Sequence, residues 1–261
     1  MKNIKFIPSF LIALTLIVSS CAVDNDPAVI PMGEAVTASL DKSGEIYAYA
    51  GNEISVGFVL SRTLAESTQF IYTLNGVENT IDLVQGQPSV TLSLPNVVGE
   101  KNTVVLKGAY ALNNDSVLVG STNTSVTFIS VPATNPNALE ILMLWNNAEA
   151  NDLDLWITDE PPTVGIAASE STTPSESLSF SNTQPDGTYN ILPRVWSAAD
   201  ATVDVEMFIF HPDGTIEIFN DSVSGETAQA WYYFVKFDKI TDAVTGDVTY
   251  KTTKLAAESV F

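Results

Sequence analysis

The chain has 261 residues, with 31 acidic against 11 basic side chains and a formal net charge of −20 at neutral pH. Nucleic acid is therefore an unsuitable partner, because its phosphates require clustered lysine and arginine. The same charge balance opposes adhesion to anionic lipid head groups by a basic patch. The single cysteine excludes an internal disulfide, so stability has to come from packed hydrophobic cores.

The first 20 residues have the layout of a secretory signal peptide. Lys2 and Lys5 precede an apolar run over 6–18, and small serines follow it. That run is shorter than the about 20 apolar residues that a membrane-spanning helix needs. The sequence VSSC at 18–21 resembles the lipobox of bacterial lipoproteins. The resemblance implies cleavage before Cys21 and attachment of lipid to this residue, which would anchor the protein in a membrane.

Residues 21–33 are expected to hold this lipid site and a flexible tether. Pro27 and Pro31 oppose regular pairing, and Asp24 and Asp26 stand close behind the cysteine. Acidic residues at this place resemble the surface-export signal of Bacteroidota-type lipoproteins, and the alternative is an ordinary acidic linker. The expected location is the cell outer membrane, with the chain lipid-anchored and either surface-exposed or facing the periplasm.

Residues 34–130 are predicted to form an immunoglobulin-like β-sandwich. Short runs rich in β-branched and aromatic residues are separated by turn signals, of which Asn75-Gly76 is the strongest. The expected strands cover 45–49, 54–60, 70–74, 80–84, 89–94, 103–110 and 125–129. Short strands at this regular spacing are typical of such sandwiches.

A second β-sandwich is predicted over 139–261, after a linker at 131–138 that is rich in proline and asparagine. The expected strands cover 139–145, 152–158, 188–196, 203–210, 215–219, 230–237 and 247–253. Both faces of 139–145 carry large apolar side chains, which favours a central strand. Residues 159–176 are rich in Pro, Ser, Thr and Glu and are expected to form a long exposed loop. The predicted class is all-β, with two tandem Ig-like β-sandwich domains after a lipoprotein signal peptide.

Three short motifs of the second domain occur in a distinctive order. They are Leu144-Trp145, then DLDL at 152–155, then DGTY at 186–189. This order resembles a recurring bacterial extracellular β-sandwich module that is appended to secreted proteases and surface proteins. The resemblance implies a module for contacting ligands, since some members bind calcium and others bind proteins or glycans. The glycine-rich stretch that usually follows DLDL is replaced here by the Pro/Ser/Thr-rich segment.

Oxygen-bearing side chains are dense around the start of 152–158, and calcium is the cation that such ligands suit. Ca²⁺ takes six to eight oxygen ligands from carboxylates, amides and carbonyls. The candidate ligands are Asn147, Asn151, Asp152 and Asp154, and the two aspartates share one face of the strand. The spacing is not that of an EF-hand loop. The alternative is a polar loop whose aspartates are simply solvated.

All four tryptophans lie in the second domain. Trp156 and Trp196 are candidate ligand-binding residues, because an exposed indole ring can stack on the apolar face of a sugar. The alternative is that these rings pack inside the sandwich, where each would bury a large apolar area. The sequence alone leaves both readings open.

The chain carries no recognisable catalytic motif. His211 is the only histidine and stands in a predicted turn, and the sequence contains no G-x-S-x-G elbow, phosphate-binding glycine loop or zinc-spaced ligand set. The chain is therefore expected to be no enzyme, and a hydrolase is the least supported alternative. The predicted function is display of β-sandwich modules that bind a glycan or protein ligand, with calcium as an optional aid. The alternative is a structural accessory subunit of an outer-membrane assembly.

Overall fold

The computed structural model describes residues 36–112, 117–118 and 123–260. The signal peptide at 1–20, Cys21 and the rest of the tether at 21–33 lie outside these residues. The described residues are all-β and contain no helix, and hence no helix that could span a membrane. Their strands form tandem β-sandwiches, so the predicted fold class is confirmed. Val36–Phe261 form one compact unit.

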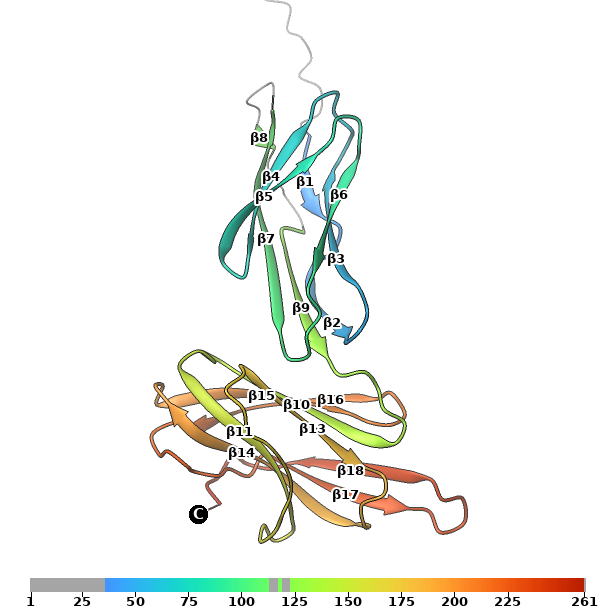
Figure 1. Cartoon of the computed structure of the whole chain (residues 1–261), viewed down its shortest axis with the longest axis vertical. Helices are drawn as coiled ribbons and strands as arrows, with labels where there is room; N and C mark the ends of the chain where they lie inside the picture. The colour runs from blue at the N-terminus through green and yellow to red at the C-terminus, as the bar shows by residue number, and fades with distance from the viewer. Residues whose placement is uncertain (1–35, 113–116, 119–122, 261) are drawn as a thin grey trace, which may run out of the picture. The chain divides into compact units, whose positions relative to one another are not determined.

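In the first sandwich a three-stranded sheet packs against a larger sheet (Figure 1). The small sheet has the order β1-β3-β6, formed by Ala38–Leu40, Ile54–Leu60 and Ser89–Leu94. The large sheet has the order β2-β9-β7-β4-β5, formed by Gly44–Tyr49, Ser125–Val131, Lys101–Ala111, Thr68–Leu74 and Val77–Leu83. The short strand β8 (Val117–Leu118) pairs with β7. Strand β2 runs parallel to β9, and every other pair is antiparallel.

Alternation along β3 builds the core of this sandwich. Ile54, Val56 and Phe58 are all buried, and the Phe58 ring lies 5.4 Å from that of Phe70 on the facing sheet. The hairpin between β4 and β5 turns at Asn75-Gly76, where both residues have positive φ. Positive φ at both positions is the signature of a type I′ turn, which matches the twist of the flanking strands. The predicted hairpin is therefore confirmed, whereas the three-residue strand β1 was too short to predict.

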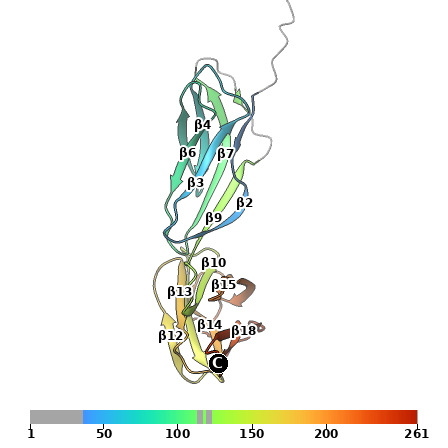
Figure 2. The same ribbon diagram turned by 90° about the vertical axis from the view of Figure 1, so that its right-hand side faces the viewer.

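Every strand pair of the second sandwich is antiparallel. Strands of both of its sheets are labelled in Figure 2. One sheet has the order β13-β10-β15-β16, formed by Ser175–Ser181, Ala138–Trp145, Thr202–Phe210 and Ile216–Ser224. The other has the order β12-β11-β14-β17-β18, formed by Gly165–Ser169, Asn151–Asp159, Gly187–Ala198, Val235–Thr241 and Val248–Lys254.

Two expectations about this domain were wrong. The segment 159–176 is not one long loop, because it contains β12 and the first residues of β13. Serine-rich composition indicated a loop, but pairing with the buried strands β11 and β10 holds both segments extended at the sheet edges. The strand expected at 230–237 is shifted to β17, and Trp231 and Tyr232 form only isolated bridges before it.

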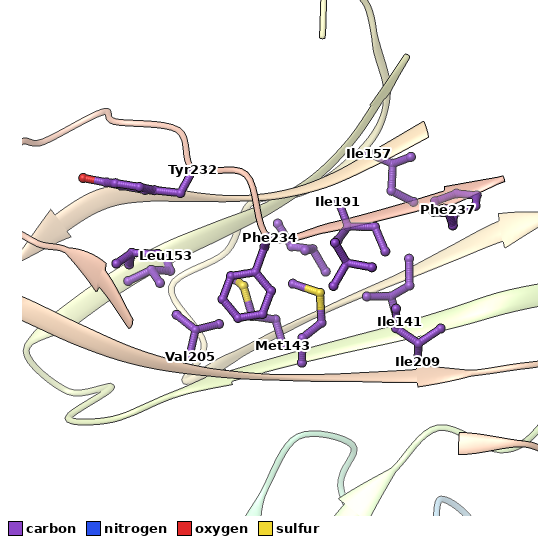
Figure 3. Packing of buried hydrophobic residues seen from close by; sticks show 14 of the residues in the cluster. Ile141, Met143, Leu153, Ile157, Ile191, Val205, Ile209, Tyr232, Phe234 and Phe237 are labelled. Atoms are coloured by element: carbon purple, nitrogen blue, oxygen red, sulfur yellow. The ribbon is translucent and has the colours of Figure 1, made fainter. Parts of the chain in front are cut away.

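Side chains from both sheets fill the second sandwich (Figure 3). Met143 of β10 and Val205 of β15 lie on one side of this cluster, and Ile191 of β14 lies on the other, around the fully buried ring of Phe234. Strand β10 is central, as predicted, because its other row of side chains joins a separate buried cluster that includes Leu142 and Leu144. Strands β11 and β14 differ, since only one row of each joins the core.

Candidate ligand-binding face

Polar and aromatic side chains cover the outer side of β11 and β14. Leu153 and Leu155 point into the core, so alternation places Asp152, Asp154 and Trp156 on the opposite side. The register between the strands shifts at Asp152/Leu153, and such a bulge re-aims the side chains beside it. We call the following set the tryptophan face: Asp152, Asp154, Trp156, Glu170, Asn190, Arg194, Trp196, Gln229 and Trp231.

Arg194 is the centre of the tryptophan face. Its guanidinium carbon lies 4.9 Å from the ring centroid of Trp196 and 5.4 Å from that of Trp231. Nη1 donates to Asp154 at 3.3 Å and to Glu170 at 3.2 Å, and Nη2 donates to the side-chain oxygen of Gln229. The guanidinium is thus held by two aromatic rings and two carboxylates.

Trp156 and Trp231 form the inner part of the face. Their ring centroids are 4.8 Å apart with the planes tilted by 60°. Gly165 on β12 leaves room for the Trp156 ring, because a β-carbon there would lie 2.9 Å from Cζ3 of the indole. Trp196, by contrast, is 48% exposed and presents an indole ring to solvent.

The carboxylates of the face differ in burial. Asp154 is only 4% exposed, and burial, reinforced by the charge of Glu170, raises its pKa to about 6 against the opposing effect of Arg194. Burial and the charge of Glu176 also raise the pKa of Asp152. Glu176 belongs to β13 and lies outside the face; it is buried and accepts hydrogen bonds from the backbone and hydroxyl of Ser171. Glu170 is half-exposed, so its carboxylate remains within reach of solvent.

The tryptophan face also concentrates unused hydrogen-bonding groups. Eight buried side-chain polar atoms of the described residues have no hydrogen-bond partner, and four of them belong to the second sandwich. All four lie on β11 and β14: Oδ1 of Asp152, Nε1 of Trp156, Oδ1 of Asn190 and Nε of Arg194. Asn190 is fully buried. A buried polar group without a partner costs about 1–3 kcal/mol, so the clustering on one face calls for an explanation.

The four residues predicted to bind calcium separate into two pairs with different surroundings. Asn151 donates to Asp200 at 2.8 Å and its oxygen accepts from the backbone of Ala199 at 3.0 Å. Asn147 donates to the same Asp200 oxygen at 2.9 Å. These two amides lower the pKa of Asp200 and brace the loop between β14 and β15. Asp152 and Asp154 belong instead to the tryptophan face.

Within the described residues, no group of three or more His, Cys, Asp or Glu side chains is arranged to hold a metal ion. Amide and backbone oxygens can complete a calcium site, so binding at these residues stays a prediction that titration has to test. In this structure the side-chain oxygen and nitrogen of Asn151 both form hydrogen bonds that hold the neighbouring loops.

The structure brings Asp154, Trp156 and Trp196 together, although the sequence assigned them to two different sites. Trp145 is the one tryptophan of the four whose ring joins the core, where Nε1 donates to the carbonyl of Asn151 at 2.8 Å. Sequence reasoning missed Arg194, Glu170 and Gln229. No local pattern marks them, because their partners are 24 to 40 residues away along the chain.

A cavity of about 1160 Å³ lies apart from the tryptophan face. Its lining includes Asn146 and Glu149 and several other acidic side chains. None of the eight unpartnered buried atoms belongs to a residue of this lining. The unused hydrogen-bonding capacity of the second sandwich is therefore on the face and not in the cavity.

No family model and no curated protein matches this chain. Among solved structures that resemble it, one is described as "Structural insight into host cell surface retention of a 1.5-MDa bacterial ice-binding adhesin". The match covers 85% of this chain and 96% of that chain, at 10% identity and a TM-score of 0.26. A likeness at this level carries no argument about function, which has to rest on the face itself.

Proposed function

We propose that this protein is a non-catalytic, lipid-anchored component of the cell envelope that binds a ligand through the tryptophan face. One observation carries the proposal: all four unpartnered buried polar atoms of the second sandwich lie on this face, which also carries the half-exposed Trp196. Each such atom costs about 1–3 kcal/mol, so the face keeps polar groups that lower the stability of the fold. Functional sites are where such costs persist.

The chemistry of the face supports binding better than catalysis. Two carboxylates, Asp154 and Glu170, share one nitrogen of Arg194, so both are occupied by a fixed cation. Asp154 is also buried. A general acid or base has to reach its substrate within hydrogen-bonding distance, and Asp154 is closed off by its own partners. The second sandwich therefore serves as the binding module and the first as a spacer.

Anchoring is proposed from the VSSC sequence at 18–21. A lipid on Cys21 would hold both sandwiches at the outer membrane, facing the surface or the periplasm. Mass spectrometry of the purified protein tests this, with an acylated Cys21 expected as the first residue. An intact Met1 or an unmodified Cys21 would contradict it. If Cys21 is acylated, protease treatment of whole cells distinguishes a protein that faces the surface from one that faces the periplasm.

Binding is tested with Trp196→Ala in the chain from residue 22 onward, which keeps the compact unit Val36–Phe261 whole. Tyr110→Ala on β7 is the matched control, because Tyr110 is also a partly exposed aromatic residue but lies in the first sandwich. We expect attachment to envelope glycans or proteins to fall with Trp196→Ala and to persist with Tyr110→Ala. Equal binding by both variants would contradict the proposal, and a fixed partner retained by both would favour an accessory subunit.

A further inference from the structure

The charges of the tryptophan face disfavour an anionic ligand. Asp154 and Glu170 pair with the one guanidinium of Arg194, and the charge of Asp152 also acts on Asp154. Lys236 pairs with Asn190 on β14, several residues along that strand from Trp196. A ligand carboxylate or sulfate that approaches Trp196 would therefore meet mainly like charge, and burial strengthens that repulsion by lowering the local dielectric.

A cationic ligand is disfavoured for a different reason. Indole rings and carboxylates together form the usual cage for a cation, but here Arg194 already fills that cage. Its guanidinium contacts the rings of Trp196 and Trp231 and bonds to Asp154 and Glu170. An incoming ammonium group would have to compete with an internal cation that is covalently part of the chain.

The remaining binding capacity suits a neutral, hydroxyl-rich molecule. Trp196 offers a flat apolar ring that is 48% exposed. Glu170, which like Trp196 contacts Arg194, is half-exposed. Gln229 is held next to Trp196 by a hydrogen bond from its amide nitrogen to the Trp196 carbonyl at 3.2 Å. A pyranose ring combines an apolar C–H face for stacking with hydroxyl groups that donate to carboxylates and amide oxygens.

We propose that the tryptophan face binds a neutral glycan, with one sugar ring stacked on Trp196 and its hydroxyl groups hydrogen-bonded to Glu170. This inference rests on the proposed function, because it names the ligand class of the same face. Arg194 holds the carboxylates of Asp154 and Glu170 and the indole ring of Trp196 in place. A neutral ligand brings no charge that would compete with this cation.

The test is an array of oligosaccharides in which neutral, uronic-acid and amino-sugar forms share the same backbones. The probe is the chain from residue 22 onward, and calorimetry on the strongest match follows. We expect the matches to be neutral glycans, with about tenfold weaker binding for Trp196→Ala, as the loss of one aromatic stacking contact predicts. Glu170→Gln should weaken binding less, and Tyr110→Ala should leave it unchanged.

Three outcomes would overturn the inference. The first is stronger binding to the uronic-acid or amino-sugar form than to the neutral form of one backbone. The second is neutral-glycan binding that Trp196→Ala leaves intact. The third is an array without any bound glycan: the proposed function then survives if a protein ligand is captured in a Trp196-dependent way, and falls as well if no Trp196-dependent ligand is found.

Discussion

Replacement of Arg194 by methionine tests the physical account of the tryptophan face most directly. Methionine keeps an apolar side chain of moderate length over the tryptophan rings and removes the guanidinium. Asp154, which is 4% exposed, then loses its cation, and the rings of Trp196 and Trp231 lose theirs. The change therefore isolates the charge at the centre of the face.

The expected loss follows from these contacts. Removing one partner of a fully buried ion pair costs about 3–5 kcal/mol. The Arg194 side chain is 17% exposed and its bond to Asp154 is 3.3 Å long, so about 2 kcal/mol is the expected share of this pair. Two cation–π contacts add about 0.5 kcal/mol each. We expect the free energy of unfolding at pH 7.5 to fall by about 3 kcal/mol.

The loss should shrink in acid. The folded pKa of Asp154 is about 6, above its ordinary value of 3.8, so the folded state binds the proton more tightly than the unfolded state. As pH falls through 6 and towards 3.8, this group therefore contributes increasing stability. Without Arg194 the pKa rises further, because the one group that lowers it is gone. At pH 5 the variant holds a neutral Asp154, and about half of the loss should disappear.

Denaturant unfolding of the wild type, Arg194→Met, Asp154→Asn and the double variant at pH 7.5 and pH 5 provides the measurement. The double-mutant cycle should show a coupling above about 1 kcal/mol at pH 7.5. A single-variant loss below about 0.5 kcal/mol, or a coupling indistinguishable from zero, would refute the reasoning. A loss of the same size at both pH values would refute the role assigned to Asp154.

Three further outcomes are expected. Asn151→Ala should lower the free energy of unfolding by about 2–4 kcal/mol, since it removes four hydrogen bonds. Asn147→Ala removes a single hydrogen bond to Asp200 and should cost less than half as much. Equal losses in the two variants would contradict the role of Asn151 in bracing the loop. Gly225→Ala should cost about 1–3 kcal/mol in thermal melts, because its β-carbon would lie 2.0 Å from the carbonyl oxygen of Asp200; Gly187→Ala is the matched control, with its nearest contact at 3.8 Å. Calorimetric titration with millimolar Ca²⁺ tests the predicted calcium site, whose expected signature is a saturable heat that Asp152→Asn abolishes; titration without heat would remove the prediction.

Much of the fold was already encoded in short stretches of sequence. The alternating residues of β3 fixed which side chains are buried, and Asn75-Gly76 specified the hairpin between β4 and β5. These features depend on the chirality of a few consecutive residues and on the two-residue period of a strand, so no distant contact is needed to recognise them. Strands β12 and β13 differ, because their serine-rich sequences become strands only through pairing with β11 and β10.

The site was decided by the tertiary structure. The sequence of β11 places Asp154 and Trp156 on the same side of a strand, but it does not say whether that side faces the core. Packing of Leu153 and Leu155 into the sandwich settles this and turns Trp156 outward. The register of β11 against β14 then sets Asp154 opposite Arg194. Trp231, which comes much later in the chain, places its ring against the same guanidinium. Side-chain alternation is a local property, whereas burial and cross-strand partners depend on segments far apart in the chain.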